Sequence, residues 1–288
     1  MPLPSWSILN FMAGSDFDAA LDQHQKWNLK LLDLKQDIYG KDIADLTPAD
    51  AMKVKEALAK RGQSVYSFST KLFHADVELG EAHFRKTFLS KIPSIVKSAK
   101  ILQPTFIRLL AATTQYRAKY ADSNAYLAME QSWLFPMYRE AVEEIAGAGF
   151  KTTIENETGN CIFSTPGEIQ EFFTRIDRPS KVGFTWDVLN LWQMGTAPTL
   201  EVYQELKPLM VYYHLKGGMA NAKGELEFGC ALQDSTWPIV EITKAVIADD
   251  VSPLICLNPA YSEKKPGYDY TDLTKKDLDF VRKTFGGE

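Results

Sequence analysis

Three side chains that bind divalent metal ions well lie at the ends of three successive hydrophobic runs. They are Glu155, Asp187 and His214, and each is about one strand and one helix further along the chain than the one before it. Carboxylate oxygens and an imidazole nitrogen suit ions such as Mg²⁺, Mn²⁺ or Zn²⁺. Neighbouring strands lie about 4.8 Å apart, so residues at their ends can reach one point. Residue types and spacing therefore predict a metal site.

Polar and hydrophobic side chains alternate along these runs, as they do on the two faces of a strand. On one face of these strands lie hydrophobic residues such as Ile154, Phe184 and Tyr213, which suit packing beneath helices. The opposite parity is polar, and on the second run it carries Asp33 beside Lys35. We expect this polar set to face a common interior; it comprises Asp33, Lys35, Arg108, Thr153, Glu155, Glu157, Thr185, Asp187, Tyr212, His214, Lys216, Cys256 and Asn258.

The elements that must position these residues alternate between short strands and longer helices over the whole chain. Helical patterns follow the strands, including one long helix over 82–101 and a helical pattern that continues to residue 146. This alternation predicts an α/β protein, a single (β/α)8 TIM barrel over residues 1–288. An open doubly wound sheet is the alternative, but no glycine-rich phosphate turn follows the first strand. The expected strands are 6–11, 31–35, 64–69, 105–111, 152–157, 182–187, 211–216 and 254–258.

Composition excludes several classes of function. The 288 residues carry 32 Lys and Arg against 37 Asp and Glu, a net charge of −5, which argues against a general nucleic-acid or anionic-membrane binder. The three cysteines form neither a disulfide framework nor a zinc ribbon. Because no secretory signal or long apolar segment is visible, we expect a cytoplasmic protein. A homo-oligomer is compatible with the sequence.

Four short motifs on the last four expected strands resemble a known family. They read TIENE over 153–157, FTWDVLN over 184–190, YHLK over 213–216 and ICLNP over 255–259. In this order they resemble the sugar phosphate isomerase/epimerase family of xylose isomerase-like TIM barrels. The family binds Mn²⁺, Mg²⁺, Co²⁺ or Zn²⁺ through Glu, Asp, His and Glu on these strands. The resemblance implies that Glu155, Asp187 and His214 are ligands and that Asn258 stands at the fourth ligand position.

The chain departs from the family at several positions. Asn258 replaces a glutamate, Asn190 stands where several members carry histidine, and Gly217 follows Lys216 where the family has aspartate. An amide adds no charge to a metal site and cannot act as a general base, so Asn258 predicts weak metal binding and argues against epimerisation with two bases. Isomerisation with one base, or elimination of water from a keto-polyol, is compatible with these residues.

The resemblance implies a metal-assisted isomerase, epimerase or dehydratase that acts on a sugar, a keto-polyol or a similar small carbohydrate. Glu155 or Glu157 would remove a proton next to a carbonyl, and Lys216 or Arg108 would bind the oxyanion or an acidic group of the substrate. Candidate lids are the polar segment 113–124 and residues 261–270. Further candidate substrate contacts are His74, Lys35 and Asn190.

Other interpretations of these residues stay open. Glu155 and Asp187 could be structural anions that pair with Lys216 and Arg108, and His214 could be an ordinary buried histidine. Asn258 could be a hydrogen-bonding prop. The barrel could then bind a small molecule or partner without catalysis. An apurinic-site endonuclease of the same fold ranks last, because it needs more histidines than the 4 present and a basic groove. The sequence leaves the substrate, its phosphorylation, the metal and the oligomeric state undetermined.

Overall fold

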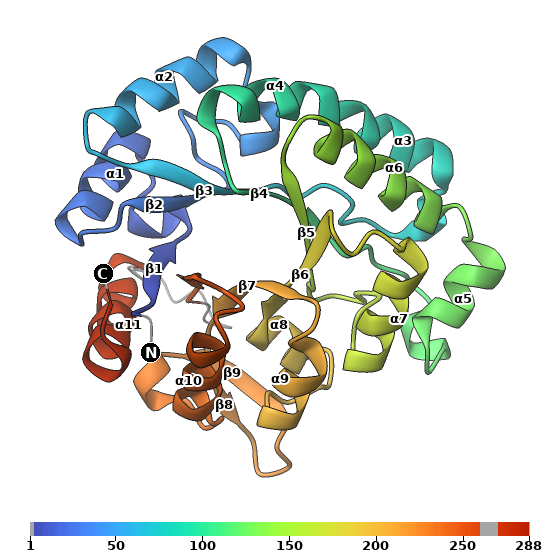
Figure 1. Ribbon diagram of the computed structural model, residues 1–288. Helices are drawn as coiled ribbons and strands as arrows, with labels where there is room; N and C mark the ends of the chain where they lie inside the picture. Colours follow the sequence, from blue (N-terminus) through green and yellow to red (C-terminus); the bar gives the residue numbers. More distant parts are fainter. Residues whose placement is uncertain (1–2, 260–269, 288) are drawn as a thin grey trace.

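Eight parallel strands form a nearly closed barrel in the computed structural model, which describes residues 3–259 and 270–287 (Figure 1). The order around the sheet is β1-β10-β7-β6-β5-β4-β3-β2. An isolated parallel bridge between Leu9, directly after β1, and Asp33 of β2 links the two ends of this order. The predicted (β/α)8 barrel is confirmed. Its strands are β1 Ser5–Ile8, β2 Leu31–Leu34, β3 Ser64–Ser69, β4 Phe106–Leu110, β5 Lys151–Glu155, β6 Val182–Asp187, β7 Met210–Leu215 and β10 Leu254–Leu257.

Helices surround the barrel on its outer side (Figure 1). Within the described residues, no helix is both long and apolar enough to cross a membrane. The helices are α1 Phe17–Lys26, α2 Pro48–Ala59, α3 Glu81–Thr87, α4 Ile92–Leu102, α5 Ser123–Glu130, α6 Leu134–Gly147, α7 Pro166–Ile176, α8 Val188–Gln193, α9 Leu200–Leu206, α10 Ile239–Asp249 and α11 Tyr270–Phe285.

Several expected elements differ from the structure. The single helix expected over 82–101 is wrong: it is two helices, α3 and α4, separated by a 3-10 turn at Leu89–Lys91. Pro93 lies in the first turn of α4, where its missing N–H costs nothing, whereas inside one long helix it would break the hydrogen-bond ladder. The first strand ends at Ile8, because residues 10–13 form a 3-10 helix. Sequence analysis also missed α8 and the hairpin of β8 Gly217–Ala220 with β9 Leu226–Cys230.

Two separate hydrophobic clusters confirm the alternation of side chains along the strands. The larger cluster lies between barrel and helices and contains Ile154, Phe184 and Tyr213. The smaller cluster contains Tyr212 and Cys256, which have the opposite parity, together with Leu9, Met12 and Leu254. The polar strand residues therefore point into the barrel, where the smaller hydrophobic cluster also lies.

The last helix carries a buried carboxyl group that makes stability depend on pH. Asp277 on α11 is 1% exposed, and its side chain accepts a hydrogen bond from the backbone N–H of Leu232 at 2.8 Å. Burial raises the pKa of Asp277 from 3.8 to about 7. Between these two pH values the unfolded chain loses this proton while the folded protein keeps it. The free energy of unfolding should therefore decrease as pH rises from about 4 to 7.

Asp277→Asn should remove this pH-dependent loss, because an amide oxygen still accepts the Leu232 hydrogen bond but carries no charge. At pH 8 we expect the variant to be more stable than the wild type by about 2–4 kcal/mol, and at pH 4 to be similar to it. Urea unfolding at both pH values measures the difference. Asp279→Asn, an exposed position on the same helix, is the control. Equal effects of the two substitutions would contradict the assignment.

Candidate active site

The three expected metal ligands converge inside the barrel. Glu155 ends β5, Asp187 ends β6, and His214 lies next to the end of β7, where the strand register pairs it with Asp187. All three are at most 1% exposed. One ligand atom from each lies within 4.8 Å of those from the other two. The parallel register thus brings together residues that are distant in the sequence.

Glu155 is held by two basic groups. Its Oε2 accepts a hydrogen bond from Arg108, and its Oε1 lies 3.1 Å from Nδ1 of His214. Burial alone would raise the pKa of Glu155, but Arg108 and His214 outweigh burial and hold it well below its ordinary value. Arg108 and His214 therefore favour the ionised form of Glu155, and both of its oxygens already have partners.

Arg108 is buried directly against Glu155. It is 1% exposed, and its three guanidinium nitrogens donate to Glu155 and to the backbone carbonyls of Ser69 and Thr70. These four hydrogen bonds use four of the five N–H groups of the guanidinium, and binding of an acidic substrate group by Arg108 stays a prediction. Its observed role is to balance and orient the Glu155 carboxylate.

Asp187 joins the site to the start of a helix. Its Oδ1 accepts the backbone N–H of Asn190 at 3.0 Å and so caps α8. Its Oδ2 lies 2.8 Å from Nζ of Lys216 and accepts a 3.3 Å hydrogen bond from Asn258. Burial, reinforced by the charge of Glu155, raises the pKa of Asp187 despite Lys216. Burial opposes the charge on His214, but Glu155 and Asp33 raise the pKa of this imidazole to about 9.

Four further predicted residues lie around this cluster with different degrees of exposure. Lys216 is 7% exposed and donates to Asn190 Oδ1 at 3.0 Å, and Asn190 in turn donates to Oε2 of Glu157 at 3.3 Å. Glu157 is half-buried and lies beyond the end of β5. Asn258 is the fourth; it directly follows β10 and is 6% exposed. These residues form a hydrogen-bonded rim above the buried acids.

Lys35 and His74 lie apart from these hydrogen bonds. Lys35 is half-buried, and its Nζ lies 5.9 Å from the centre of the Phe11 ring. Burial, together with the charge of Arg108, lowers the pKa of Lys35, and in the described part of the chain it forms no ion pair. His74 is exposed, with Nδ1 3.4 Å from the Ala111 carbonyl. The structure does not bring His74 into the cluster.

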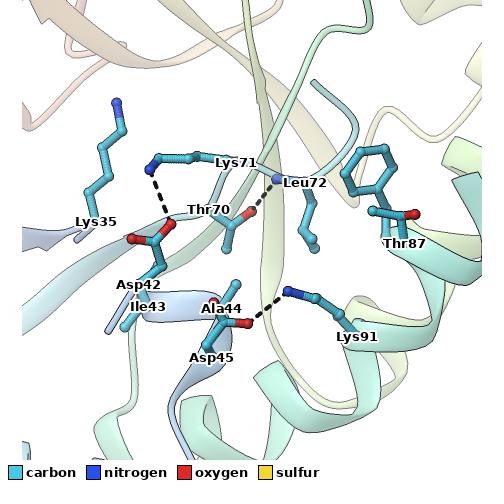
Figure 2. Close-up of a pocket in the computed structure, with 11 residues that line it drawn as sticks. Lys35, Asp42, Ile43, Ala44, Asp45, Thr70, Lys71, Leu72, Thr87 and Lys91 are labelled. Atoms are coloured by element: carbon cyan, nitrogen blue, oxygen red, sulfur yellow. Dashed lines mark hydrogen bonds and ion pairs between the residues drawn. The ribbon is translucent and has the colours of Figure 1, made fainter. Parts of the chain in front are cut away.

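A pocket of about 100 Å³ lies beside Lys35 (Figure 2). Its other two lysines are paired, Lys71 with Asp42 at 3.1 Å and Lys91 with Asp45 at 2.7 Å. The Lys35 side chain extends away from Lys91 and Thr87 (Figure 2). The ammonium group of Lys35 is therefore free to contact a ligand of the barrel interior.

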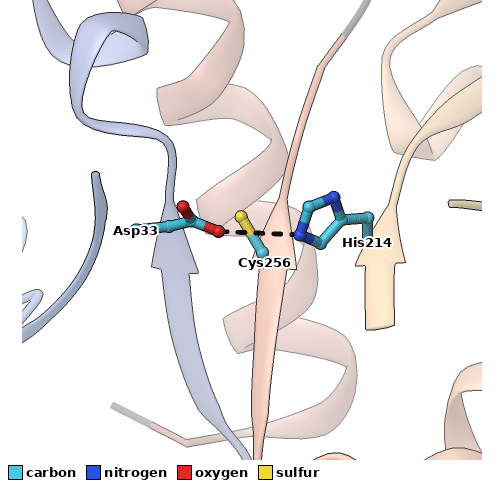
Figure 3. Close-up of side chains that lie close together, drawn as sticks. All are labelled: Asp33, His214 and Cys256. Carbon is cyan, nitrogen blue, oxygen red and sulfur yellow. Dashed lines mark ion pairs between the residues drawn. The ribbon is translucent and has the colours of Figure 1, made fainter. Parts of the chain in front are cut away.

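Three residues that the sequence did not mark as functional contribute to the site. Asn156 clamps the backbone of Asp187 with a pair of hydrogen bonds of 2.9 Å each. Asp33 and Cys256 lie on the other side of His214 (Figure 3). The alternation of side chains along their strands could have indicated that Asp33 and Cys256 face the site, whereas no local sequence pattern indicates the role of Asn156.

The structure explains one departure from the family and constrains one of the expected lids. A side-chain carbon on Gly217 would lie 2.2 Å from the carbonyl oxygen of Cys230, so the β8–β9 hairpin excludes the family aspartate there. The segment 113–124 is anchored through Glu168, which accepts hydrogen bonds from Arg117 and Ser123. Residues 261–269 of the other expected lid lie outside the described residues.

The donor set fits a divalent cation. Two carboxylates and one imidazole are hard or borderline ligands, and they already lie at compatible separations. An ion between them would replace the proton on Nδ1 of His214 and compete with Lys216 for Asp187. This competition and the uncharged Asn258 predict weak binding.

Comparisons with known proteins agree with this architecture. No family model and no curated protein matches the chain. Among solved structures, a xylose isomerase-like TIM barrel protein from Mycobacterium smegmatis in complex with magnesium is 14% identical over 99% of this chain and 97% of its own, with a TM-score of 0.70. The probable 3-DHS dehydratase AsbF from Bacillus anthracis is 16% identical over 96% and 98%, with a TM-score of 0.70.

A third structure, D-psicose 3-epimerase from Clostridium cellulolyticum H10 with D-tagatose, is 12% identical over 98% and 99% of the two chains, with a TM-score of 0.70. Low identity combined with nearly complete coverage means that the likeness is one of fold. The protein is a (β/α)8 barrel with a buried polar centre. Its fold is that of the xylose isomerase-like TIM barrels, as the motifs on the last four strands predicted.

Proposed function

We propose that this protein is a metal-assisted enzyme that removes a proton next to a carbonyl of a sugar or keto-polyol. The observation that carries the proposal is the convergence of Glu155, Asp187 and His214 at the carboxyl ends of adjacent strands, where barrels of this kind build their active sites. Similar folds in an epimerase and a probable dehydratase support this class of chemistry. The reaction is an isomerisation, an epimerisation or a loss of water.

Glu155, Asp187 and His214 would hold the ion, with Asn258 beside Asp187. When bound, a divalent ion polarises the substrate carbonyl and stabilises negative charge that develops on its oxygen. Lys216 orients Asp187, to which it is bonded at 2.8 Å. The half-buried ammonium of Lys35 would bind a hydroxyl, carbonyl or acidic group of the substrate.

Glu157 is the better of the two candidate bases. Glu155 is fully buried, and its depressed pKa makes its carboxylate a weak proton acceptor. Glu157 is half-buried, and Asn190 orients only one of its oxygens. Glu157 can therefore take a proton from a substrate at its other oxygen, Oε1, while Glu155 binds the ion.

A barrel that only binds a small molecule or a partner is the alternative, and one observation favours it. Both oxygens of Glu155 and both oxygens of Asp187 already accept hydrogen bonds from the protein. Such a cluster could be a purely structural network. An endonuclease stays the least supported function, since His214 is the one histidine of this cluster.

Titration with Mn²⁺ tests the metal assignment. We expect one ion per chain in the wild type, and at least a 100-fold loss of affinity in Glu155→Gln and in His214→Ala, since each removes a ligand. Glu241→Gln, an exposed carboxylate on α10, is the matched control and should bind as the wild type does. A wild type that takes up no Mn²⁺ at millimolar concentration would support the binding-only alternative.

Asn258→Glu tests the fourth ligand position. The amide of Asn258 lies 3.3 Å from Asp187 Oδ2, so a carboxylate at this position would add a negative charge next to the ion. Because ligand charge increases cation affinity, we expect Mn²⁺ to bind about 10-fold more tightly or better. Isothermal titration measures this change. Unchanged or weaker binding would mean that residue 258 does not face the ion.

A further inference from the structure

The imidazole of His214 lies between acids on both of its sides. Nδ1 faces the proposed metal site, 3.1 Å from Glu155 Oε1 and 3.9 Å from Asp187 Oδ2. Nε2 points the opposite way and lies 3.6 Å from Oδ2 of Asp33 on β2 (Figure 3). His214 and all three acids are at most 1% exposed. The ring therefore connects the metal site to a buried carboxylate on its other side (Figure 3).

The surroundings of Nε2 leave Asp33 as its partner. In the part of the chain that the structure describes, Nε2 of His214 and Oδ1 of Asp33 are buried without a hydrogen-bond partner. The smaller hydrophobic cluster lies beside them and contains Leu9, Met12, Leu254, Cys256 and Tyr212. Buried polar atoms in native proteins are almost always paired. A shift of about 0.5 Å would bring Nε2 and the Asp33 carboxylate to hydrogen-bond distance.

The Asp33 carboxylate is itself oriented toward the ring. The hydroxyl of Tyr212 donates to Asp33 Oδ2 at 3.2 Å, and Tyr212 lies on β7 two positions before His214. The bridge between Leu9 and Asp33 fixes the backbone of Asp33 where the barrel closes. The backbone of Asp33 is therefore fixed by the barrel strands, and its carboxylate is oriented by Tyr212 on the strand that carries His214.

We infer that Asp33 is a positioning residue that accepts a hydrogen bond from the Nε2–H of His214 and so leaves Nδ1 as the nitrogen that binds a metal ion. A neutral imidazole carries one proton, and the hydrogen bond made by one nitrogen decides which nitrogen is left as a ligand. Without an ion, Nδ1 donates a proton to Glu155, so an ion that binds there must displace that proton while Nε2 keeps its own. Without Asp33, the neutral ring would keep its proton on Nδ1, where Glu155 accepts it and where it blocks the ion. The inference rests on the proposed function only in naming the ion as the ligand of Nδ1.

The same three residues allow a different use of Nε2. One donor atom each from Asp33, His214 and Cys256 lies within 4.8 Å of the other two, so they could bind an ion of their own. The structure favours the hydrogen bond between His214 and Asp33 over such an ion, because Cys256 belongs to the smaller hydrophobic cluster. In addition, the Sγ of Cys256 lies 3.7 Å from the Leu257 carbonyl, the contact expected of a thiol that donates a hydrogen bond. An ion would need a thiolate there.

Ring-nitrogen NMR of the metal-free protein, combined with Mn²⁺ titration, tests the inference. In the wild type we expect a protonated Nε2. In Asp33→Leu, Nε2 should be unprotonated while Nδ1 keeps the proton that it donates to Glu155, and Mn²⁺ affinity should fall about 10–100-fold. Asp33→Asn keeps an acceptor oxygen, so it should retain the protonated Nε2 and most of the affinity. Cys256→Ala should bind Mn²⁺ as the wild type does.

Other results would overturn the inference. An unprotonated Nε2 in the wild type contradicts it directly, even if Asp33→Leu does not fold. Loss of affinity in Cys256→Ala as well as in Asp33→Leu would assign Asp33 and Cys256 as ligands instead. A wild type with a protonated Nε2 that binds no Mn²⁺ would contradict the proposed function while leaving the hydrogen bond to Asp33 supported.

Discussion

Arg108→Leu is expected to lower the free energy of unfolding by about 3–5 kcal/mol, the usual cost of removing one partner from a buried ion pair. Arg108 and Glu155 are each 1% exposed, so water cannot replace the lost guanidinium. The substitution would also leave the carbonyls of Ser69 and Thr70 without the donors that Arg108 supplies. Urea unfolding at pH 7 measures the loss.

Two controls separate this effect from a general loss of charge. Arg85→Leu removes an exposed partner of Glu81 and Glu140 and should cost less than about 1 kcal/mol. The double variant Arg108→Leu/Glu155→Gln no longer buries an unpaired carboxylate, so it should recover part of the stability lost in the single variant. A cost for Arg108→Leu as small as that for Arg85→Leu would show that Glu155 is not held by this pair.

The alternation of side chains made the centre of the site predictable. Glu155, Asp187 and His214 share the inward parity of neighbouring parallel strands, and a strand allows its side chains only two directions. The register then brings the ends of β5, β6 and β7 together without any further information. Sequence alone could therefore predict which residues meet, because the backbone geometry of the barrel decides it.

The roles within the cluster depend on contacts that no sequence pattern records. Arg108 was predicted to bind a substrate group, and the structure shows in addition that it donates to Glu155 and to the carbonyls of Ser69 and Thr70 at the end of β3. Asn156 has the outward parity of its strand, yet it binds the backbone of Asp187 because β5 ends one residue earlier. Such roles arise from neighbouring elements, so they could not be predicted from periodicity.

The hairpin after β7 was missed for a related reason. Gly217 and Gly218 begin β8, and glycines usually indicate a loop in a sequence. Their strand conformation depends on pairing with Gly229 and Cys230, more than ten residues later in the chain. The family resemblance places an aspartate at the position of Gly217, whereas the structure shows that glycine makes room there for the backbone of Cys230.

Glu157→Gln is expected to lower kcat by about 10²–10⁴-fold, the usual contribution of a general base. Glutamine keeps an oxygen that can accept the hydrogen bond from Asn190, so the rim should retain its structure. Since Glu157 is not among the three converging ligands, Mn²⁺ affinity should stay within about twofold of the wild type. Exchange of substrate carbon-bound hydrogen with deuterated water, across a panel of ketoses, measures the proton transfer itself.

Comparison with Glu155→Gln separates the two carboxylates. Glu155→Gln should lose Mn²⁺ binding and activity together, whereas Glu157→Gln should lose only the exchange reaction. Glu56→Gln, an exposed position on α2, should change neither property. If Glu157→Gln retained full exchange while the metal site stayed intact, the base would have to be a different group. Glu155 could take that role only if substrate binding displaced Arg108 from it, because Arg108 and His214 otherwise hold its pKa too low for efficient proton abstraction.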